Sequence, residues 1–130
     1  MHSRIGASIT LAVMLATSAA WAHHNMSAVF DLNQPFTRTG TLTRIDWRNP
    51  HIGLSVDAKS DQGQVEAWVY EGPAPTVFRN RNVNKGHFEA AIGKTVTVEA
   101  SRARDGSRSG LIRRITLPDG RVVSLCPQNC

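Results

Sequence analysis

Residues 51–71 read HIGLSVDAKSDQGQVEAWVYE, a stretch in which apolar and polar side chains alternate on both sides of a turn. A period of two is the pattern of a β-strand with one buried face. In the first half of the stretch, the apolar residues that share a face are Ile52, Leu54 and Val56. His51 is therefore expected to point away from the core side of this strand, or to lie at its open end.

The second half of the stretch, residues 65–71, predicts another strand, which the turn at 61–63 joins to the first as a hairpin. Trp68 and Tyr70 share one face of this strand, opposite three smaller apolar residues. These two aromatic side chains either fill the core or offer a surface on which a ligand stacks. We expect the core for at least one of them.

More strand patterns flank this hairpin. Before it, Leu42 and Ile45 in residues 37–47 differ in phase, which indicates a β-bulge, and Gly40 marks a place where the strand coils. After it, alternation returns in three runs, over residues 94–102, 111–117 and 121–125. The last two runs flank Asp119-Gly120, the strongest local hairpin signal in the chain.

A short helix is predicted between the third and fourth strands. Pro75 fits its first turn, and the helix is expected to run to about Val83. Around this end, Asn82, Asn84 and Gly86 break the helical pattern. Three strands, a helix and further strands are the order of a small five-stranded open β-barrel of the oligonucleotide/oligosaccharide-binding (OB) type. A plain β-sandwich is the competing architecture, but one helix in this position fits the barrel better. The fold class is therefore predicted as mainly β.

The N-terminus has the pattern of a secretory signal peptide. A short basic start precedes an apolar, small-residue run, and Ala20-Trp21-Ala22 has the small-x-small form that signal peptidase accepts. We expect cleavage after Ala22, a mature chain that begins at His23, and a periplasmic or secreted location. The expected parts are a signal peptide over 1–22, an N-terminal arm over 23–35, a β-barrel domain over 36–125 and a cysteine-containing tail over 126–130.

The formal net charge is +5 at pH 7, which is only moderately basic. For an exported protein this charge favours an anionic envelope component or a small anion over nucleic acid. The expected partner is therefore an unidentified small ligand or an envelope component. Arg102, Arg104 and Arg108 cluster around the loop before the predicted strand at 111–117, and they suggest contact with an envelope polyanion. A solvated, charged loop is the competing interpretation.

The connection between the first two strands, Trp47-Arg48-Asn49-Pro50-His51, is the leading candidate for ligand contacts. In an OB fold the first connecting loop and strands two and three form the usual binding face. A ligand groove would then include Trp47, Asn49, His51 and Trp68. In the structural interpretation, Pro50 and Asn49 shape the turn and Trp47 caps the core.

A metal site is the alternative function. Cleavage after Ala22 frees the α-amine of His23, and this amine and imidazole nitrogens from His23, His24 and His51 suit copper or another transition metal. The competing interpretation is that His23 and His24 lie on a frayed terminus.

Cys126 and Cys130, the two cysteines of the chain, are close enough in sequence to form a disulfide in an oxidising compartment. A redox or metal role for this tail is the other possibility. The sequence contains no Gly-x-Ser-x-Gly elbow, no Gly-rich phosphate loop and no His-Glu-x-x-His motif. We therefore expect a binding or accessory protein rather than an enzyme, with no assigned cofactor unless copper binds.

Residues 40–51, GTLTRIDWRNPH, carry a pattern that resembles a family of small exported bacterial proteins classed as a domain of unknown function. In that family a signal peptide ending in Ala precedes a mature His-His start, and a Gly-Thr-Val-Thr stretch leads into Trp-x-Asn-Pro-His. The resemblance extends to LPDGR at 117–121 and so covers nearly all of the mature chain. The cysteine tail is not part of the family pattern. The resemblance implies no particular activity.

Overall fold

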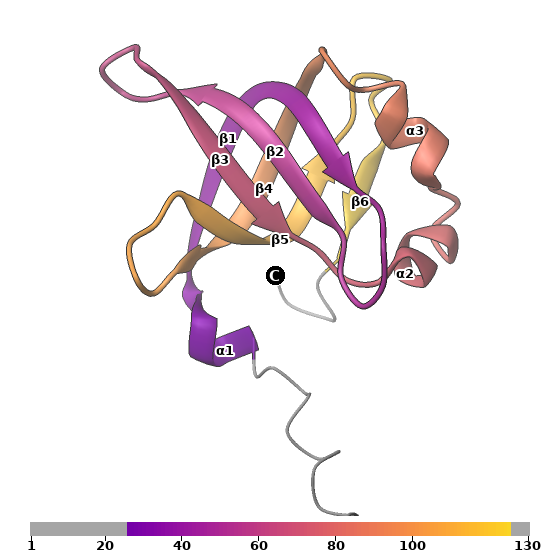
Figure 1. The fold of residues 1–130 in the computed structure, drawn as a ribbon, viewed down its shortest axis with the longest axis horizontal. Coiled ribbons are helices and arrows are strands. Elements are labelled where there is room, and N and C mark those ends of the chain that lie inside the picture. Colours follow the sequence, from indigo (N-terminus) through magenta and orange to yellow (C-terminus); the bar gives the residue numbers. More distant parts are fainter. Residues whose placement is uncertain (1–25, 126–130) are drawn as a thin grey trace, which may run out of the picture.

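A computed structural model of the protein describes residues 26–125, and it confirms a mainly β fold (Figure 1). Six strands form one sheet: β1 Phe30–Asp46, β2 Gly53–Lys59, β3 Val65–Glu71, β4 Thr95–Ala103, β5 Ser109–Thr116 and β6 Val122–Ser124. In the same described part of the chain, three short helices accompany them: α1 Met26–Val29, α2 Pro75–Arg79 and α3 Lys85–Glu89.

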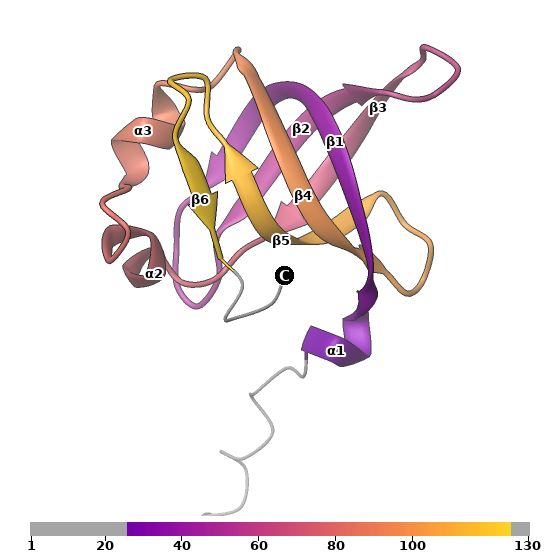
Figure 2. The same ribbon diagram turned by 180° about the vertical axis from the view of Figure 1, so that it is seen from behind.

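The sheet closes on itself. The strand order is β3-β2-β1-β4-β5-β6, and β3 also pairs with β5, in parallel, from Val69↔Ser109 to Glu71↔Leu111. Five strands thus form a ring in the order β1-β2-β3-β5-β4, and β6 adds to β5 as its antiparallel neighbour. Figure 2 shows β1, β4, β5 and β6 from behind, with α2 and α3 to one side of the ring.

β1 is the longest strand and pairs with two neighbours. It pairs with β2 from Gly40 to Asp46 and with β4 from Phe30 to Thr41, so both pairings include Gly40 and Thr41. The predicted bulge is confirmed, because the register with β2 shifts between Leu42 and Arg44. β1 begins earlier than the boundary expected at residue 36, so that residues 30–35 belong to the sheet rather than to an arm.

The core lies inside the ring, on the faces that the alternation predicts. Its most deeply buried large side chains are Tyr70, Phe78, Phe88, Leu42, Ile52, Leu54 and Ile115. The predicted hairpin over 51–71 is confirmed, with Leu54 opposite Tyr70 and Val56 opposite Trp68. The last hairpin is confirmed as well, and β5 and β6 flank Gly120, whose φ is +87°.

The helical region differs from the prediction. One helix to about Val83 was expected, but α2 ends at Arg79, Asn82 has a positive φ of 58°, and α3 follows. Asn84, which reads as a pattern breaker, is the N-cap of α3, and its side chain accepts a hydrogen bond from the His87 backbone N–H. Asparagine favours both turns and N-caps, so its position alone does not separate the two.

β1 approaches β2 closely at Gly40. A Cβ at this position would lie 2.3 Å from the Asp57 carbonyl oxygen and 2.9 Å from the Ala58 Cα, both of which are backbone atoms. We expect Gly40→Ala to lower the free energy of unfolding by about 1–3 kcal/mol, the usual cost of overpacking. Urea unfolding followed by circular dichroism measures it.

Gly53→Ala is the matched control, since its nearest neighbour would be the Asp46 Cβ at an ordinary 3.5 Å. Equal unfolding midpoints for the two variants would contradict the close approach at Gly40.

Candidate functional site

Trp47 begins the β1–β2 connection, the loop for which the sequence predicts ligand contacts. Its ring packs against Phe78 of α2 and Phe88 of α3, with a centroid distance of 5.2 Å in each pair. The Trp47 side chain is half-buried, whereas both phenylalanines are fully buried and meet edge to face. These contacts make Trp47 a cap on the core between the sheet and the two helices, while its remaining exposed part borders the loop.

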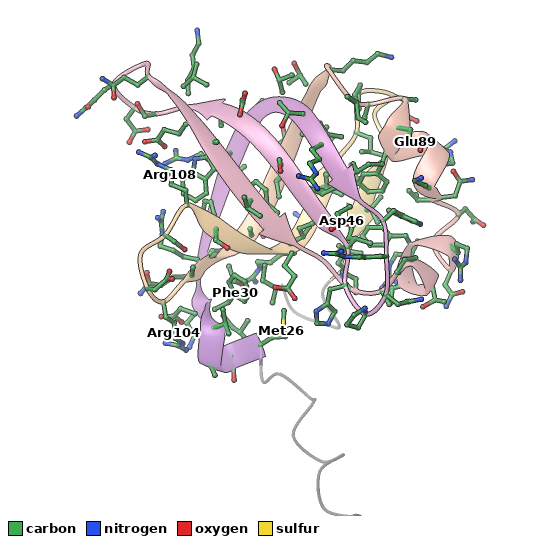
Figure 3. The ribbon with its side chains drawn as sticks, in the orientation of Figure 1. Met26, Phe30, Asp46, Glu89, Arg104 and Arg108 are labelled. Atoms are coloured by element: carbon green, nitrogen blue, oxygen red, sulfur yellow. The ribbon has the colours of Figure 1, made fainter. Side chains whose placement is uncertain are left out.

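Asn49 is exposed in the middle of this connection, where the Asn49–Pro50 peptide bond is cis. Its neighbour Arg48 reaches back to the end of β1, and its Nη2 lies 2.9 Å from Oδ2 of Asp46. Figure 3 shows Asp46 at that end of the strand. Among residues 26–125 no side chain pairs with that of Asn49, so its amide is free to meet a partner.

His51 lies beside Glu71, the last residue of β3. Its Nδ1 is 2.5 Å from Oε1 of Glu71, and each side chain is about one-third exposed. The predicted orientation of His51 is confirmed, because the next residue, Ile52, points into the core. Since Glu71 takes Nδ1, the Nε2 nitrogen of His51 is left for another partner.

Sequence reasoning missed the two carboxylates of this region, Asp46 and Glu71. Gly53 is the cross-strand partner of both, so the three residues form one row across β1, β2 and β3. Because Gly53 has no side chain, the row presents bare backbone between two acidic residues. The hairpin register that pairs Gly53 with Glu71 could have predicted this row. The register, however, depends on the geometry of the turn, which the sequence alone does not give.

Trp68 is in the core and not on a ligand-binding surface. Only 3% of it is exposed, its Nε1–H donates to Oε2 of Glu66 at 3.2 Å, and its ring lies 5.0 Å from that of Phe36. Tyr70 on the same face is also fully buried. Of the two interpretations of these aromatic residues, the core one is therefore correct for both. The outer face of β3 instead carries Val65, Ala67 and Val69.

The arginines around the β4–β5 loop contact their own chain. Arg108 lies 3.1 Å from Glu66, and the Nε–H of Arg104 donates to the Ser27 carbonyl at 2.8 Å. Figure 3 shows Arg104 beside α1 and Arg108 beside β3. Arg102 is half-buried, and its guanidinium carbon lies 4.7 Å from the centroid of the Phe36 ring. The sequence could not predict these pairings, because the partners are far away along the chain.

His23, His24, Cys126 and Cys130 lie outside the described residues, so their predicted roles stay predictions. Within residues 26–125 no group of three or more His, Cys, Asp or Glu side chains is arranged to hold a metal ion. In the same part of the chain, no helix has the length and apolar character needed to cross a membrane.

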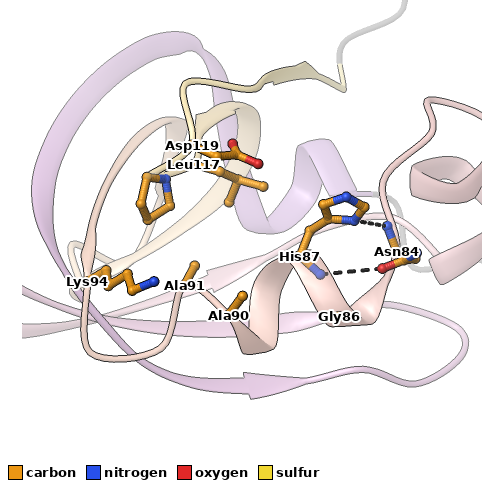
Figure 4. A pocket seen from close by; sticks show the side chains of 9 residues that line it. Asn84, Gly86, His87, Ala90, Ala91, Lys94, Leu117 and Asp119 are labelled. Atoms are coloured by element: carbon orange, nitrogen blue, oxygen red, sulfur yellow. Dashed lines mark hydrogen bonds between the residues drawn. The ribbon is translucent and has the colours of Figure 1, made fainter.

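A surface pocket lies beside α3, away from the β1–β2 connection (Figure 4). Its lining includes Asn84, His87, Lys94 and Asp119. Most of its polar groups are already used by the fold: Nδ1 of His87 accepts from the Asn84 backbone N–H at 3.1 Å, and hydrogen bonds from Arg121 hold the pKa of Asp119 below its usual range. We therefore interpret this pocket as the junction of α3 with the last hairpin.

Comparison with known families adds one finding to this geometry. Residues 11–114 match the "Family of unknown function (DUF6152)". The chain belongs to this DUF6152 family. No curated protein and no solved structure matches the chain.

DUF6152 membership confirms the resemblance to an uncharacterised family that the sequence indicates. The match includes the β1–β2 connection and the β4–β5 loop, and it ends before β6 and the cysteine tail. Membership in the DUF6152 family assigns no activity to the chain.

The contacts of Trp47 predict a structural cost for its removal. We expect Trp47→Ala to lower the free energy of unfolding by about 3 kcal/mol, near the lower end for buried aromatic truncations, because the side chain is half-buried. Asn49→Ala, an exposed change in the same loop, is expected to stay within about 0.5 kcal/mol of the unmodified protein. Urea unfolding of both variants checks this. If Trp47→Ala lowers the free energy of unfolding no more than Asn49→Ala does, Trp47 is not a cap on the core and the ligand-groove interpretation is favoured.

Proposed function

We propose that this protein is exported, acts by binding, and has an OB-type barrel whose outer face on β2 and β3 is the binding face. The observation that supports this most is the strand order of the ring, β1-β2-β3-β5-β4, with α2 and α3 inserted between β3 and β4. An OB fold is a five-stranded Greek-key barrel that binds ligands on strands two and three and on the loops beside them. The N-terminal leader pattern supports export.

The outer face of β3 is apolar in its middle. Val65 and Val69 are 67% and 54% exposed, and Ala67 lies exposed between them. On β2, the residues opposite Ala67 and Val69 are Asp57 and Ser55, which are small and polar. An apolar centre with a polar rim is typical of a surface that binds protein.

The polar rim of this face lies toward the β1–β2 connection. The exposed Asn49 side chain and the paired side chains of His51 and Glu71 lie at that end. These groups offer hydrogen bonds that would set the orientation of a partner. Both large aromatic residues of β3 point inward, so the face offers a partner apolar and backbone contacts rather than ring stacking.

β3 also has an open edge. Its pairing with β5 begins only at Val69, so the part from Val65 to Trp68 has a ladder partner on the β2 side alone. In Figure 1 the β2–β3 hairpin extends past the rest of the ring. An exposed strand edge can add an extended peptide by backbone hydrogen bonds, with alternate side chains giving specificity. We therefore take the partner to be an extended segment of another envelope protein.

Copper binding is a second candidate, and the His51–Glu71 pair favours it. Histidines that bind metals commonly donate their other ring nitrogen to a carboxylate, which fixes the orientation of the ring. His51 has this arrangement at Nδ1. His23 and His24 would supply the further nitrogens. The polyanion alternative has less support, because Arg104 and Arg108 are already paired within the chain.

A peptide display library tests the proposed binding face. Selection on the mature protein is expected to enrich peptides with alternating apolar residues. Val69→Lys should weaken their binding at least about tenfold, since it places a charge in the apolar centre of the contact. Binding is measured by fluorescence anisotropy of the selected peptides.

Val122→Lys is the matched control, because Val122 is 60% exposed on β6, away from β3. Its binding should equal that of the unmodified protein. Val65→Lys gives a second variant if Val69→Lys fails to fold. If the selected peptides bind the lysine variants of β3 as tightly as they bind the unmodified protein, the proposed binding face is wrong.

Copper binding is tested by calorimetric titration of Cu(II) into protein whose start at His23 has been checked by mass spectrometry. The expected result is tight binding that an extra Ala before His23 abolishes. Glu71→Gln should weaken it about 10- to 100-fold, the usual effect of losing a carboxylate behind a ligand histidine. Equally weak binding by the authentic and the extended protein would eliminate the metal function.

A further inference from the structure

A second aromatic cluster lies on the inner side of β1 and β3, separate from the one around Trp47. Phe36, Trp68 and Tyr70 are its members, with ring centroids 5.0 to 6.3 Å apart. Two arginines lie over its rings. The Cζ atom of Arg38 is 5.4 Å from the centroid of the Trp68 ring, and the Cζ atom of Arg102 is 4.7 Å from that of Phe36. Two positive charges are thus held over one buried aromatic surface.

Two buried polar atoms of this cluster have no hydrogen-bond partner among residues 26–125. They are the hydroxyl of Tyr70, a residue with no exposed area, and Nε of Arg38. Buried polar groups in folded proteins nearly always have a partner, so an unpaired group calls for a specific explanation such as a bound water or ion. Here a donor and a group that can donate or accept are unpaired within the same cluster.

The charges of the cluster are also poorly compensated. The side chain of Arg102 has no carboxylate partner among residues 26–125. That of Arg38 has Asp61 at 3.6 Å, but Asp61 is 95% exposed, and such surface pairs contribute little. Both arginines act on Tyr70: burial raises the pKa of its hydroxyl, and the positive charges of Arg38 and then Arg102 oppose that rise. Both guanidinium groups therefore act electrostatically on this hydroxyl.

We propose that Arg38, Arg102 and Tyr70 form a binding site for a small oxyanion, a phosphate or a carboxylate group. The Nε–H of Arg38, the O–H of Tyr70 and the N–H groups of Arg102 donate to its oxygens. A water molecule would satisfy the hydrogen bonds but would leave the two charges uncompensated, whereas guanidinium groups match the geometry of both kinds of oxyanion. This site is independent of the proposed peptide face, which lies on the other side of β3.

Thermal unfolding of the mature protein tests the site, with sodium phosphate and sodium acetate added separately at constant ionic strength. A ligand that binds the folded state raises the unfolding temperature as its concentration increases. We expect this rise for at least one of the two anions, and we expect the intrinsic tryptophan emission to change with it, since Trp68 lies under Arg38. The anion with the larger effect identifies a phosphoryl or a carboxylate ligand.

Three variants separate binding from fold stability. Arg102→Gln is expected to abolish the response. Tyr70→Phe is expected to weaken anion affinity about three- to tenfold, the effect of one hydrogen bond. It should leave the anion-free protein as stable or more stable, because the hydroxyl has no partner in the part of the chain that the structure describes. Arg104→Gln, a change in a paired arginine nearby, should respond like the unmodified protein.

The site is refuted if neither anion raises the unfolding temperature, or if Arg102→Gln responds as the unmodified protein does. An unchanged affinity in Tyr70→Phe would equally exclude the hydroxyl as a donor. None of these outcomes depends on whether β3 binds a peptide on its outer face.

Discussion

The close approach of three strands at Gly110 is the constraint on which the ring depends. Gly110 pairs with Tyr70 of β3 on one side and with Arg102 of β4 on the other. A Cβ at this position would lie 2.9 Å from that of Ala100 and 3.0 Å from Cζ of Phe36. Because glycine leaves this space, the Phe36 ring can pack over the junction, and β3 can come near enough to β5 to close the sheet.

Ring closure decides which side chains of β3 meet the core and which face outward. With the strand fixed at both its neighbours, Trp68 and Tyr70 lie inside, whereas Val65, Ala67 and Val69 lie outside. Closure also brings the β4–β5 loop beside β3, where the Val69 backbone N–H donates to the Arg108 carbonyl at 3.0 Å. The proposed binding face and the cluster of Phe36, Trp68 and Tyr70 therefore lie on opposite sides of β3.

Local pattern predicted the elements whose residues alternate cleanly, and it failed where a partner far along the chain decides the outcome. The hairpin over 51–71 and the bulge after Leu42 follow from periodicity alone. The start of β1 at Phe30 does not, because its pairing with β4 shifts register before Pro35 and removes the alternation. Likewise, the orientation of His51 follows from the strand pattern, whereas its partner Glu71 depends on register.

The chemistry of the buried residues suggests that the inner cluster serves more than stability. Trp68 also has a buried polar group, but its Nε1–H finds an acceptor in Glu66. The Tyr70 hydroxyl has no partner among the described residues, and an unpaired buried hydroxyl costs about 1–3 kcal/mol that phenylalanine would not incur. Arg38 adds a second buried donor, its Nε–H, that has no acceptor among residues 26–125. Such a cost is recovered when a ligand supplies the missing acceptor, which is why the cluster is better explained by binding than by packing.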